Sequence, residues 1–186
     1  FFESYLMDNY TFEEVQDFYN HLTDRVKQSA PGVKLRQNID EMGMVSVGGI
    51  APNFRAATPD GQELSLYSLR GHVVLLDFWA SWCGPCMAEM PNVKEIYKKY
   101  HDRGLEILGV SLDSKKEPWV AAIEKNELNW KHLSTLNKFD CPIAQRFRVT
   151  GIPRMYIIDK EGKIVAQDLR GEALAQKMEE LFAGQK

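Results

Sequence analysis

The sequence predicts an α/β fold in which helices cover both faces of a sheet, preceded by a helical extension. Beyond residue 49, stretches typical of strands and of helices alternate along the chain, which favours a layered α/β domain. Two apolar runs, HVVLLDFW and LEILGVSL, are typical of buried central strands, and only Asp77 interrupts the first. We therefore expect an N-terminal helical segment over residues 1–48 and one α/β domain over residues 49–186.

The extension opens with TFEE, a capping box in which Thr11 is the N-cap and Glu14 lies three residues on. Apolar residues then recur at intervals of three and four through Val26, and SAPG is expected to stop this helix. A second helix is expected to follow and to end at Gly43. The segment carries no cysteine, and its aromatic-rich face needs a partner. It is either an arm packed on the domain, a remnant of a larger N-terminal region, or a surface for dimerisation or substrate docking.

Each element of the domain has its own signal. A hairpin is expected where two short strand-like stretches flank the turn TPDG. A helix should follow the first apolar run, from about Cys83 to Asp102, and a second helix, EPWVAAIEKN, has Pro118 in its first turn. CPIAQRF indicates a short helix, RMYIID and KIVAQDL indicate two strands joined by KEG, and the C-terminal residues predict a final helix.

Composition and charge exclude several classes of protein. The 186 residues carry a net charge of -3 with scattered lysines and arginines, which does not suggest a nucleic-acid surface. No run of about 18 apolar residues is present, so no membrane-spanning helix is expected. The cysteines are Cys83, Cys86 and Cys141, too few for a small disulfide-stapled fold. Usage this sparse favours a cysteine pair reserved for chemistry.

The stretch SWCGPC places Cys83 at the start of the helix expected after the first apolar run. Backbone N–H groups lack partners there and the helix dipole is positive, so a thiolate is favoured over a thiol. Gly84 leaves room for a substrate backbone, and Pro85 has no N–H to lose in the first turn. Cys86 lies about one turn on, close enough to form a reversible disulfide with Cys83.

A lone C-x-x-C also admits a zinc half-site or a static crosslink. Zinc normally requires a second such pair, and none exists; Cys141 with a histidine completes a site by count alone, but no two histidines lie at ligand spacing. A crosslink across so short a loop constrains little of the unfolded chain. The pattern therefore favours a redox pair, with no metal and no organic cofactor.

DFWASWCGPC resembles the active-site strand and helix start of thioredoxins. APNF, the long segment after LGVSLD, and VTGIPRMYIIDKEGKIV resemble the TlpA/ResA branch of that superfamily, the thioredoxin-like thiol–disulfide oxidoreductases. The resemblance covers residues 49–183 and implies a thioredoxin-like fold, a mixed central sheet flanked by helices. It also implies thiol–disulfide exchange on a disulfide-containing protein substrate, in which Cys83 attacks, Cys86 resolves, and an upstream thiol reductase restores the dithiol.

The resemblance assigns further residues to the site. Pro153 matches the family's cis-proline opposite the cysteine pair, where the backbone of Ile152 would pair with an incoming peptide. The alternative is a trans proline that opens an ordinary strand. Trp82 matches the partly exposed tryptophan beside the nucleophile, and Trp79 matches the one packed beneath the site. Pro91 matches a kink in the active-site helix.

Two acids are candidates for proton transfer with Cys86. Asp77 lies in the middle of an apolar strand, where burial should raise its pKa unless it is partnered. It matches the thioredoxin acid that serves the resolving cysteine. The ResA-like branch usually has an amide at this position and a glutamate three residues past the second cysteine, and that position is Glu89 here. The alternatives are a purely structural Asp77 and an exposed helix residue at Glu89.

Two residues depart from the family pattern. Arg154 follows the expected cis-proline where threonine is common. It is either a cation that tunes the thiols or selects an acidic substrate edge, or a solvated side chain. Cys141 has no counterpart in the family, and is either a small buried filler or a redox thiol.

The Gly-Pro dipeptide between the cysteines is that of thioredoxin, which favours the reducing direction. The resemblance implies a bacterial extracytoplasmic enzyme, periplasmic and compatible with a membrane tether that precedes residue 1. Two alternatives are a non-catalytic module that docks a partner and a peroxidase of the peroxiredoxin group. The peroxidase needs a proline seven residues and a threonine three residues before its cysteine, where this chain has Leu76 and Ala80.

Overall fold

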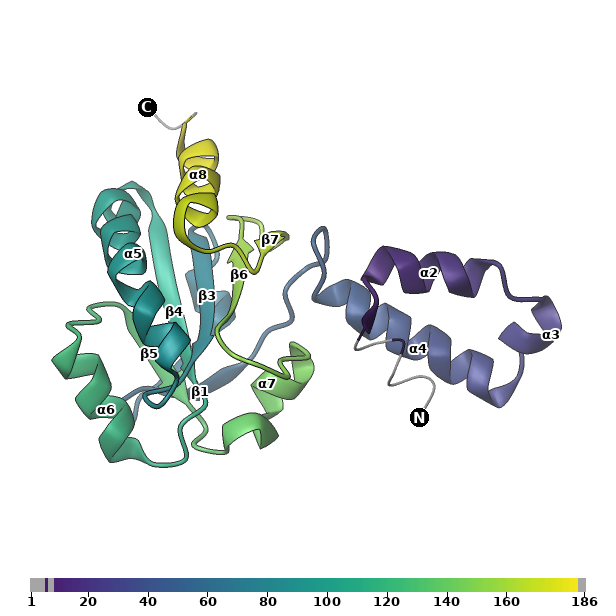
Figure 1. The fold of residues 1–186 in the computed structure, drawn as a ribbon, viewed down its shortest axis with the longest axis horizontal. Helices are drawn as coiled ribbons and strands as arrows, with labels where there is room; N and C mark the ends of the chain where they lie inside the picture. Colours follow the sequence, from purple (N-terminus) through teal and green to yellow (C-terminus); the bar gives the residue numbers. More distant parts are fainter. Residues whose placement is uncertain (1–5, 7–8, 184–186) are drawn as a thin grey trace.

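The computed structural model describes residue 6 and residues 9–183, so the ends of both expected segments (1–5, 7–8 and 184–186) lie outside the described residues (Figure 1). Its main body is a mixed sheet with the strand order β2-β1-β5-β4-β3-β6-β7 and helices on both faces. The strands are β1 (Arg55–Ala57), β2 (Glu63–Ser65), β3 (Val73–Trp79), β4 (Leu105–Ser111), β5 (Lys131–Ser134), β6 (Arg154–Ile158) and β7 (Ile164–Gln167). The helices are α2 (Phe12–Asn20), α3 (Asp24–Lys27), α4 (Ala30–Met44), α5 (Gly84–Tyr100), α6 (Lys116–Lys125), α7 (Pro142–Arg146) and α8 (Gly171–Phe182), with short 3₁₀ turns η1 (Leu66–Leu69), η2 (His101–Arg103) and η3 (Lys138–Asp140).

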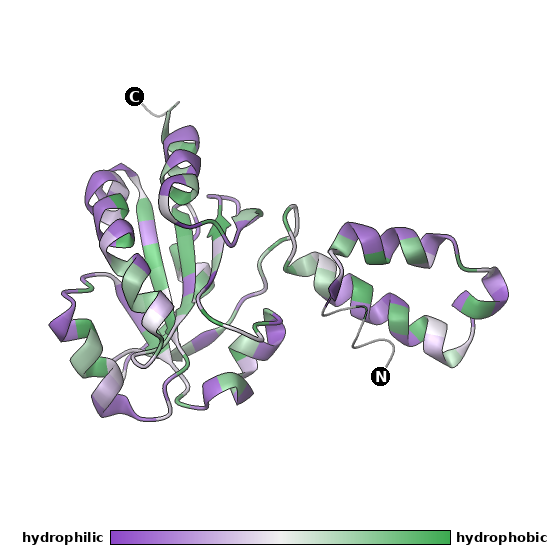
Figure 2. Cartoon of the chain, in the orientation of Figure 1, coloured by the Kyte–Doolittle hydropathy of each residue, from purple (hydrophilic) through white to green (hydrophobic). Residues whose placement is uncertain are grey.

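Strand β3 lies inside the sheet, between β4 and β6. It pairs in parallel with β4 and antiparallel with β6, and all of its residues are buried. A strand covered on both faces needs a nearly continuous apolar run, and the central strands are accordingly the most hydrophobic part of the molecule in Figure 2. Asp77 therefore lies mid-sheet, level with Gly109 on β4 and Met155 on β6.

The two faces of the sheet carry different helices. Side chains of successive strand residues point to opposite faces. Phe78 packs on Phe147, which follows α7, with 5.6 Å between the ring centroids. The next residue belongs instead to a cluster of rings that reaches α5, made of Trp79, His132, Trp130 and Tyr97. Asp77, two residues before Trp79, shares the face of α5. The predicted α/β architecture, a mixed sheet flanked by helices, is confirmed.

The capping box of the extension is present as predicted. The Glu14 N–H donates to Thr11 Oγ1 at 3.3 Å, and the Thr11 N–H donates to Glu14 Oε2 at 2.8 Å. These bonds satisfy N–H groups that have no partner within the first turn of α2.

The expected end of this first helix is wrong. Helix α2 ends at Asn20, whose carbonyl oxygen accepts from Lys27 Nζ at 2.7 Å, and the short helix α3 intervenes. SAPG begins α4 rather than stopping a helix, because Ser29 Oγ accepts from the Gly32 N–H at 3.2 Å and proline is tolerated in a first turn. Helix α4 also continues past Gly43 to Met44.

Strand β5 was not expected. It pairs in parallel with β4 and antiparallel with β1, so it joins the hairpin to the rest of the sheet. Four residues that include a lysine and a histidine give no clear strand pattern. Pairing with neighbouring strands, rather than local preference, determines this element.

The extension and the domain have separate apolar cores. Helices α2 and α4 enclose a small cluster with Leu6, and the other cluster fills the domain. Residues 45–51 connect the two: Val45 and Ala51 belong to the domain core, and the Gly48 N–H donates to the Ile164 carbonyl at 2.8 Å. Within the described residues, no helix combines the length and apolar character needed to cross a membrane.

Candidate active site

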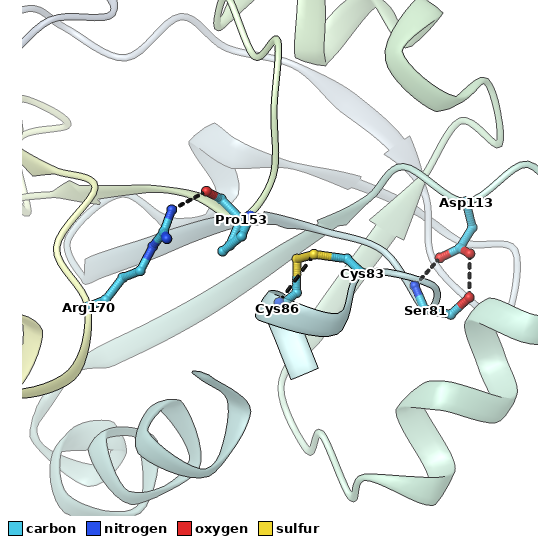
Figure 3. Close-up of a disulfide and its surroundings, with 6 residues drawn as sticks. All are labelled: Ser81, Cys83, Cys86, Asp113, Pro153 and Arg170. Atoms are coloured by element: carbon cyan, nitrogen blue, oxygen red, sulfur yellow. Dashed lines mark hydrogen bonds between the residues drawn. A yellow bond between two sulfur atoms is a disulfide. The ribbon is translucent and has the colours of Figure 1, made fainter. Parts of the chain in front are cut away.

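The predicted cysteine pair is joined in a disulfide at the start of α5 (Figure 3). Cys83 is the N-cap of this helix, and its Sγ accepts the Cys86 N–H at 3.2 Å. Pro85 occupies the first turn, and open space lies on the side of Gly84 where a side chain would stand. Cys83 is 4% exposed and Cys86 1%, so the first cysteine is the more accessible of the two, but by less than the sequence suggested.

The cis-proline loop faces the pair. The Ile152–Pro153 peptide bond is cis, and Figure 3 shows the Pro153 ring turned toward the disulfide. Among the described residues, neither the N–H nor the carbonyl of Ile152 has a hydrogen-bond partner. A backbone with both groups free can pair with an added strand.

The connection between β7 and α8 holds this loop from behind. Arg170 Nη2 donates to the Pro153 carbonyl at 2.7 Å (Figure 3). The next N–H, that of Gly171, donates to Glu89 Oε1 at 2.8 Å, and Asn92 Nδ2 donates to the same oxygen at 2.7 Å. Glu89 is therefore a half-buried, hydrogen-bonded acid rather than a freely exposed helix residue.

Asp77 is the buried acid of the site, 1% exposed. Neither of its carboxylate oxygens has a hydrogen-bond partner among the residues that the structure describes. Burial raises the pKa of Asp77 to about 7; the negative charge of Glu89 adds to the rise, and Arg170 opposes it. Such a carboxyl exchanges a proton near neutral pH, which is the property that a proton acceptor requires.

A second buried acid, Asp113, anchors the loop that precedes the cysteines (Figure 3). Its Oδ1 accepts from Ser81 Oγ at 2.6 Å, and its Oδ2 accepts from the Ser81 N–H at 3.0 Å and from Ser111 Oγ at 2.8 Å. Asp113, just after the end of β4, thereby holds Ser81, which lies between the end of β3 and Cys83. The acid directly after the second apolar run was the available signal in the sequence, and it was missed, as was Arg170, which has no local signal.

The two tryptophans lie in different environments, as the sequence predicts. Trp82 is 55% exposed beside Cys83. Trp79 is fully buried, and its ring packs edge-on against His132 at 5.5 Å. Burial lowers the pKa of His132 to about 4, so this ring is neutral at physiological pH.

The two residues that depart from the family pattern do not join the site. Arg154 pairs with Asp168 and donates from Nε to Tyr156 Oη at 3.1 Å, so its charge is neither free nor simply solvated. Cys141 is fully buried in the domain core. In the part of the chain that the structure covers, no group of three or more metal-ligating side chains comes together.

Comparisons with known proteins agree with this geometry. The family model described as AhpC/TSA matches residues 47–167. The chain is 32% identical to the thiol-disulfide oxidoreductase ResA of Bacillus thuringiensis subsp. konkukian and 35% identical to that of Bacillus anthracis, each match covering 73% of this chain and 76% of the relative.

Solved structures give the same result. The thioredoxin domain of a thiol-disulfide oxidoreductase from Bacteroides vulgatus matches with a TM-score of 0.69 at 32% identity, over 73% of this chain and 96% of that one. A thiol:disulfide interchange protein from Bacteroides sp. matches with a TM-score of 0.70 at 32% identity, over 77% and 94%. The chain therefore belongs to the AhpC/TSA family and to the thiol-disulfide oxidoreductases related to ResA.

Proposed function

We propose that this oxidoreductase reduces disulfides in protein substrates, with Cys83 as the attacking thiolate and Cys86 as the resolving thiol. The observation that carries the proposal is the position of Cys83 Sγ at the N-terminus of α5, where it accepts a backbone N–H. A positive helix end and an N–H donor both stabilise a thiolate.

The reaction moves two electrons from the dithiol to the substrate. Cys83 Sγ⁻ attacks one substrate sulfur, a Cys83–substrate disulfide forms, and the other substrate sulfur leaves as a thiolate that takes a proton from water. Cys86 Sγ⁻ then attacks Cys83 Sγ, the Cys83–Cys86 disulfide forms, and the second substrate thiolate leaves. A dithiol reductase upstream must return two electrons and two protons before the next cycle.

Asp77 is the proposed acceptor of the Cys86 proton. Its carboxylate oxygens are unpaired among the described residues, and its pKa of about 7 matches a base that works at neutral pH. One oxygen of Glu89 is engaged by Asn92 and Gly171, so we assign it a supporting role through its charge.

The substrate would lie along the loop before Pro153, with its backbone paired to Ile152, while Trp82, Gly84 and Pro85 form the surface around the attacked sulfur. The resemblance to the ResA group supports a bacterial extracytoplasmic location and a disulfide-containing protein as substrate. A non-catalytic docking module would not need a resolving cysteine with an acid behind it. The peroxidase alternative lacks a hydroxyl at Ala80, which is fully buried.

Insulin reduction with a regenerating dithiol tests the proposal, together with a Cys86→Ser trap. We expect activity in the wild type, none in Cys83→Ser, and a stable mixed disulfide between Cys86→Ser and a protein substrate. Cys141→Ser, which alters the buried cysteine outside the C-x-x-C motif, should retain insulin reduction. Activity that survives Cys83→Ser, or a stable mixed disulfide that Cys83→Ser forms through Cys86, would overturn the assignment.

We also propose that the N-terminal extension, expected over residues 1–48, is a unit separate from the redox domain and ends at about residue 44, because Val45 packs in the domain core. Its own apolar cluster supports this division. Every residue assigned to the chemistry lies beyond residue 76.

A further inference from the structure

Exposed aromatic side chains gather beside the disulfide. Among the described residues after Asn53, the large apolar side chains that are exposed are Tyr67, Trp82 and Phe139. Trp82 and Phe139 contact each other, with 6.5 Å between ring centroids and 56° between ring planes. Exposed apolar side chains that adjoin one another mark interaction sites more often than isolated ones do.

The segment that presents Phe139 is held in an unusual backbone conformation. Leu136 has φ +58° and Lys138 has φ +50°, in the left-handed region that residues with a side chain rarely adopt. The Leu136 N–H donates to Ser134 Oγ at 3.0 Å, which fixes this segment to the end of β5. Strained backbone persists where the surrounding structure enforces it, and it concentrates at functional sites.

The position of Trp82 and Phe139 relative to Cys83 determines which part of a substrate these two rings can contact. In Figure 3, Pro153 and Ser81 lie on opposite sides of the disulfide. Trp82 lies between Ser81 and Cys83 in sequence, directly next to the proposed attacking cysteine. Because the Trp82 ring is exposed, the neighbours of a substrate cysteine bonded to Cys83 can reach it.

We propose that Trp82 and Phe139 form an aromatic platform that binds an apolar side chain next to the substrate cysteine. The inference rests on the proposed function, and it makes the substrate class narrower: disulfides flanked by aliphatic or aromatic residues. The charges next to Phe139 do not favour a charged substrate residue of either sign, because Lys138 and Asp140 carry opposite charges. Aromatic anchors at the centre of an interface typically provide much of its affinity.

Two peptides test the platform. They are identical except that leucine or serine stands on both sides of the cysteine, and each carries its cysteine in a mixed disulfide with a chromophoric aryl thiol. Release of that thiol by the reduced protein gives the second-order rate constant. The wild type should prefer the leucine peptide by roughly tenfold, the size of discrimination that one apolar contact provides. Phe139→Ser should remove most of this preference, and Phe139→Leu should retain it.

Matched controls separate the platform from the reaction itself. Phe18→Ser alters a phenylalanine of similar exposure, 39% against 37%, in α2 of the extension, and should leave the preference unchanged. A small hydroxyalkyl disulfide, which has no apolar group beside its sulfur, should react at the same rate with the wild type and with Phe18→Ser. Equal rates with both peptides in the wild type, or an unchanged preference in Phe139→Ser, would overturn the platform. Failure to react with the small disulfide would overturn the exchange reaction, and the platform with it.

Discussion

At the scale of single residues, Asp77 links the chemistry to the stability of the fold. Its pKa rises from 3.8 to about 7 on folding, mainly through burial. Between these values the unfolded chain releases a proton that the folded protein keeps. The free energy of unfolding therefore falls as pH rises from about 4 to about 7, and the loss is complete above that range.

Asp77→Asn should remove this pH dependence. Between pH 5 and pH 8, the wild type should lose roughly 2–3 kcal/mol relative to the variant, because the slope of about 1.4 kcal/mol per pH unit fades as Asp77 ionises near pH 7. Urea unfolding of the oxidised proteins at pH 5 and pH 8 measures the difference. Asp102→Asn, at an exposed acid, controls for the change in net charge. Parallel pH profiles for the wild type and Asp77→Asn would contradict the raised pKa.

The two acids should also differ in kinetics. Asp77→Asn should slow the release of the mixed disulfide at least about tenfold, within the range of general-base effects, and Glu89→Gln should slow it less. Neither change should much affect the first attack by Cys83. Stopped-flow measurements with a disulfide peptide separate the two steps. A larger release defect in Glu89→Gln would move the proton-transfer role to the helix acid.

At the scale of elements, Asp113 joins β4 to the loop that delivers Cys83. An asparagine has one acceptor oxygen and one amide donor, so Asp113→Asn either takes the acceptor from the Ser81 N–H or forces the Ser81 hydroxyl to turn and accept from the amide. We expect a loss of about 1–3 kcal/mol in stability. We also expect slower attack on a small disulfide at a pH where Cys83 is fully ionised, because the loop is less well held. Ser81→Ala removes one of these bonds and should show a smaller effect. An unchanged attack rate in Asp113→Asn would contradict a positioning role.

The elements that could be predicted are those with a signal in their own residues. The two long apolar runs predict β3 and β4, and the capping box predicts the start of α2. Strand β5 is too short for periodicity to show, and it depends on pairing with β4 and β1. SAPG was misread because serine and proline favour a helix start as well as a turn.

The candidate site likewise contains residues that the local sequence indicates and contacts that it does not. The cysteine pair and Asp77 stand out in the local sequence, and the fold places them on one face of β3. The contacts of Glu89 with Gly171 and of Arg170 with Pro153 join residues about 80 and 17 positions apart. Contacts of this kind arise from the tertiary fold, so no local pattern could have indicated them.

At the scale of the whole molecule, the proposed division near residue 44 gives a test by truncation. A protein that starts at Val45 keeps the residues that pack in the domain core and pair with β7, whereas one that starts at Pro52 loses them. We expect the first to retain insulin reduction and the second to be markedly less stable. Removing Val45 alone from the core should cost roughly 1.5–3 kcal/mol. Equal loss of activity and folding in both proteins would show that the extension is integral to the domain.

The connection between extension and domain has a consequence for self-association. Strand β7 is the last strand of the sheet, and its outer side would offer unpaired N–H and carbonyl groups to any passing chain. Ile50 bridges to Lys163, and the N–H and the carbonyl of Ile164, the first residue of β7, bond to Gly49 and Gly48 of the same molecule. The segment that joins extension and domain thereby shortens the free edge that β7 presents to other chains, which lowers the tendency to associate edge to edge.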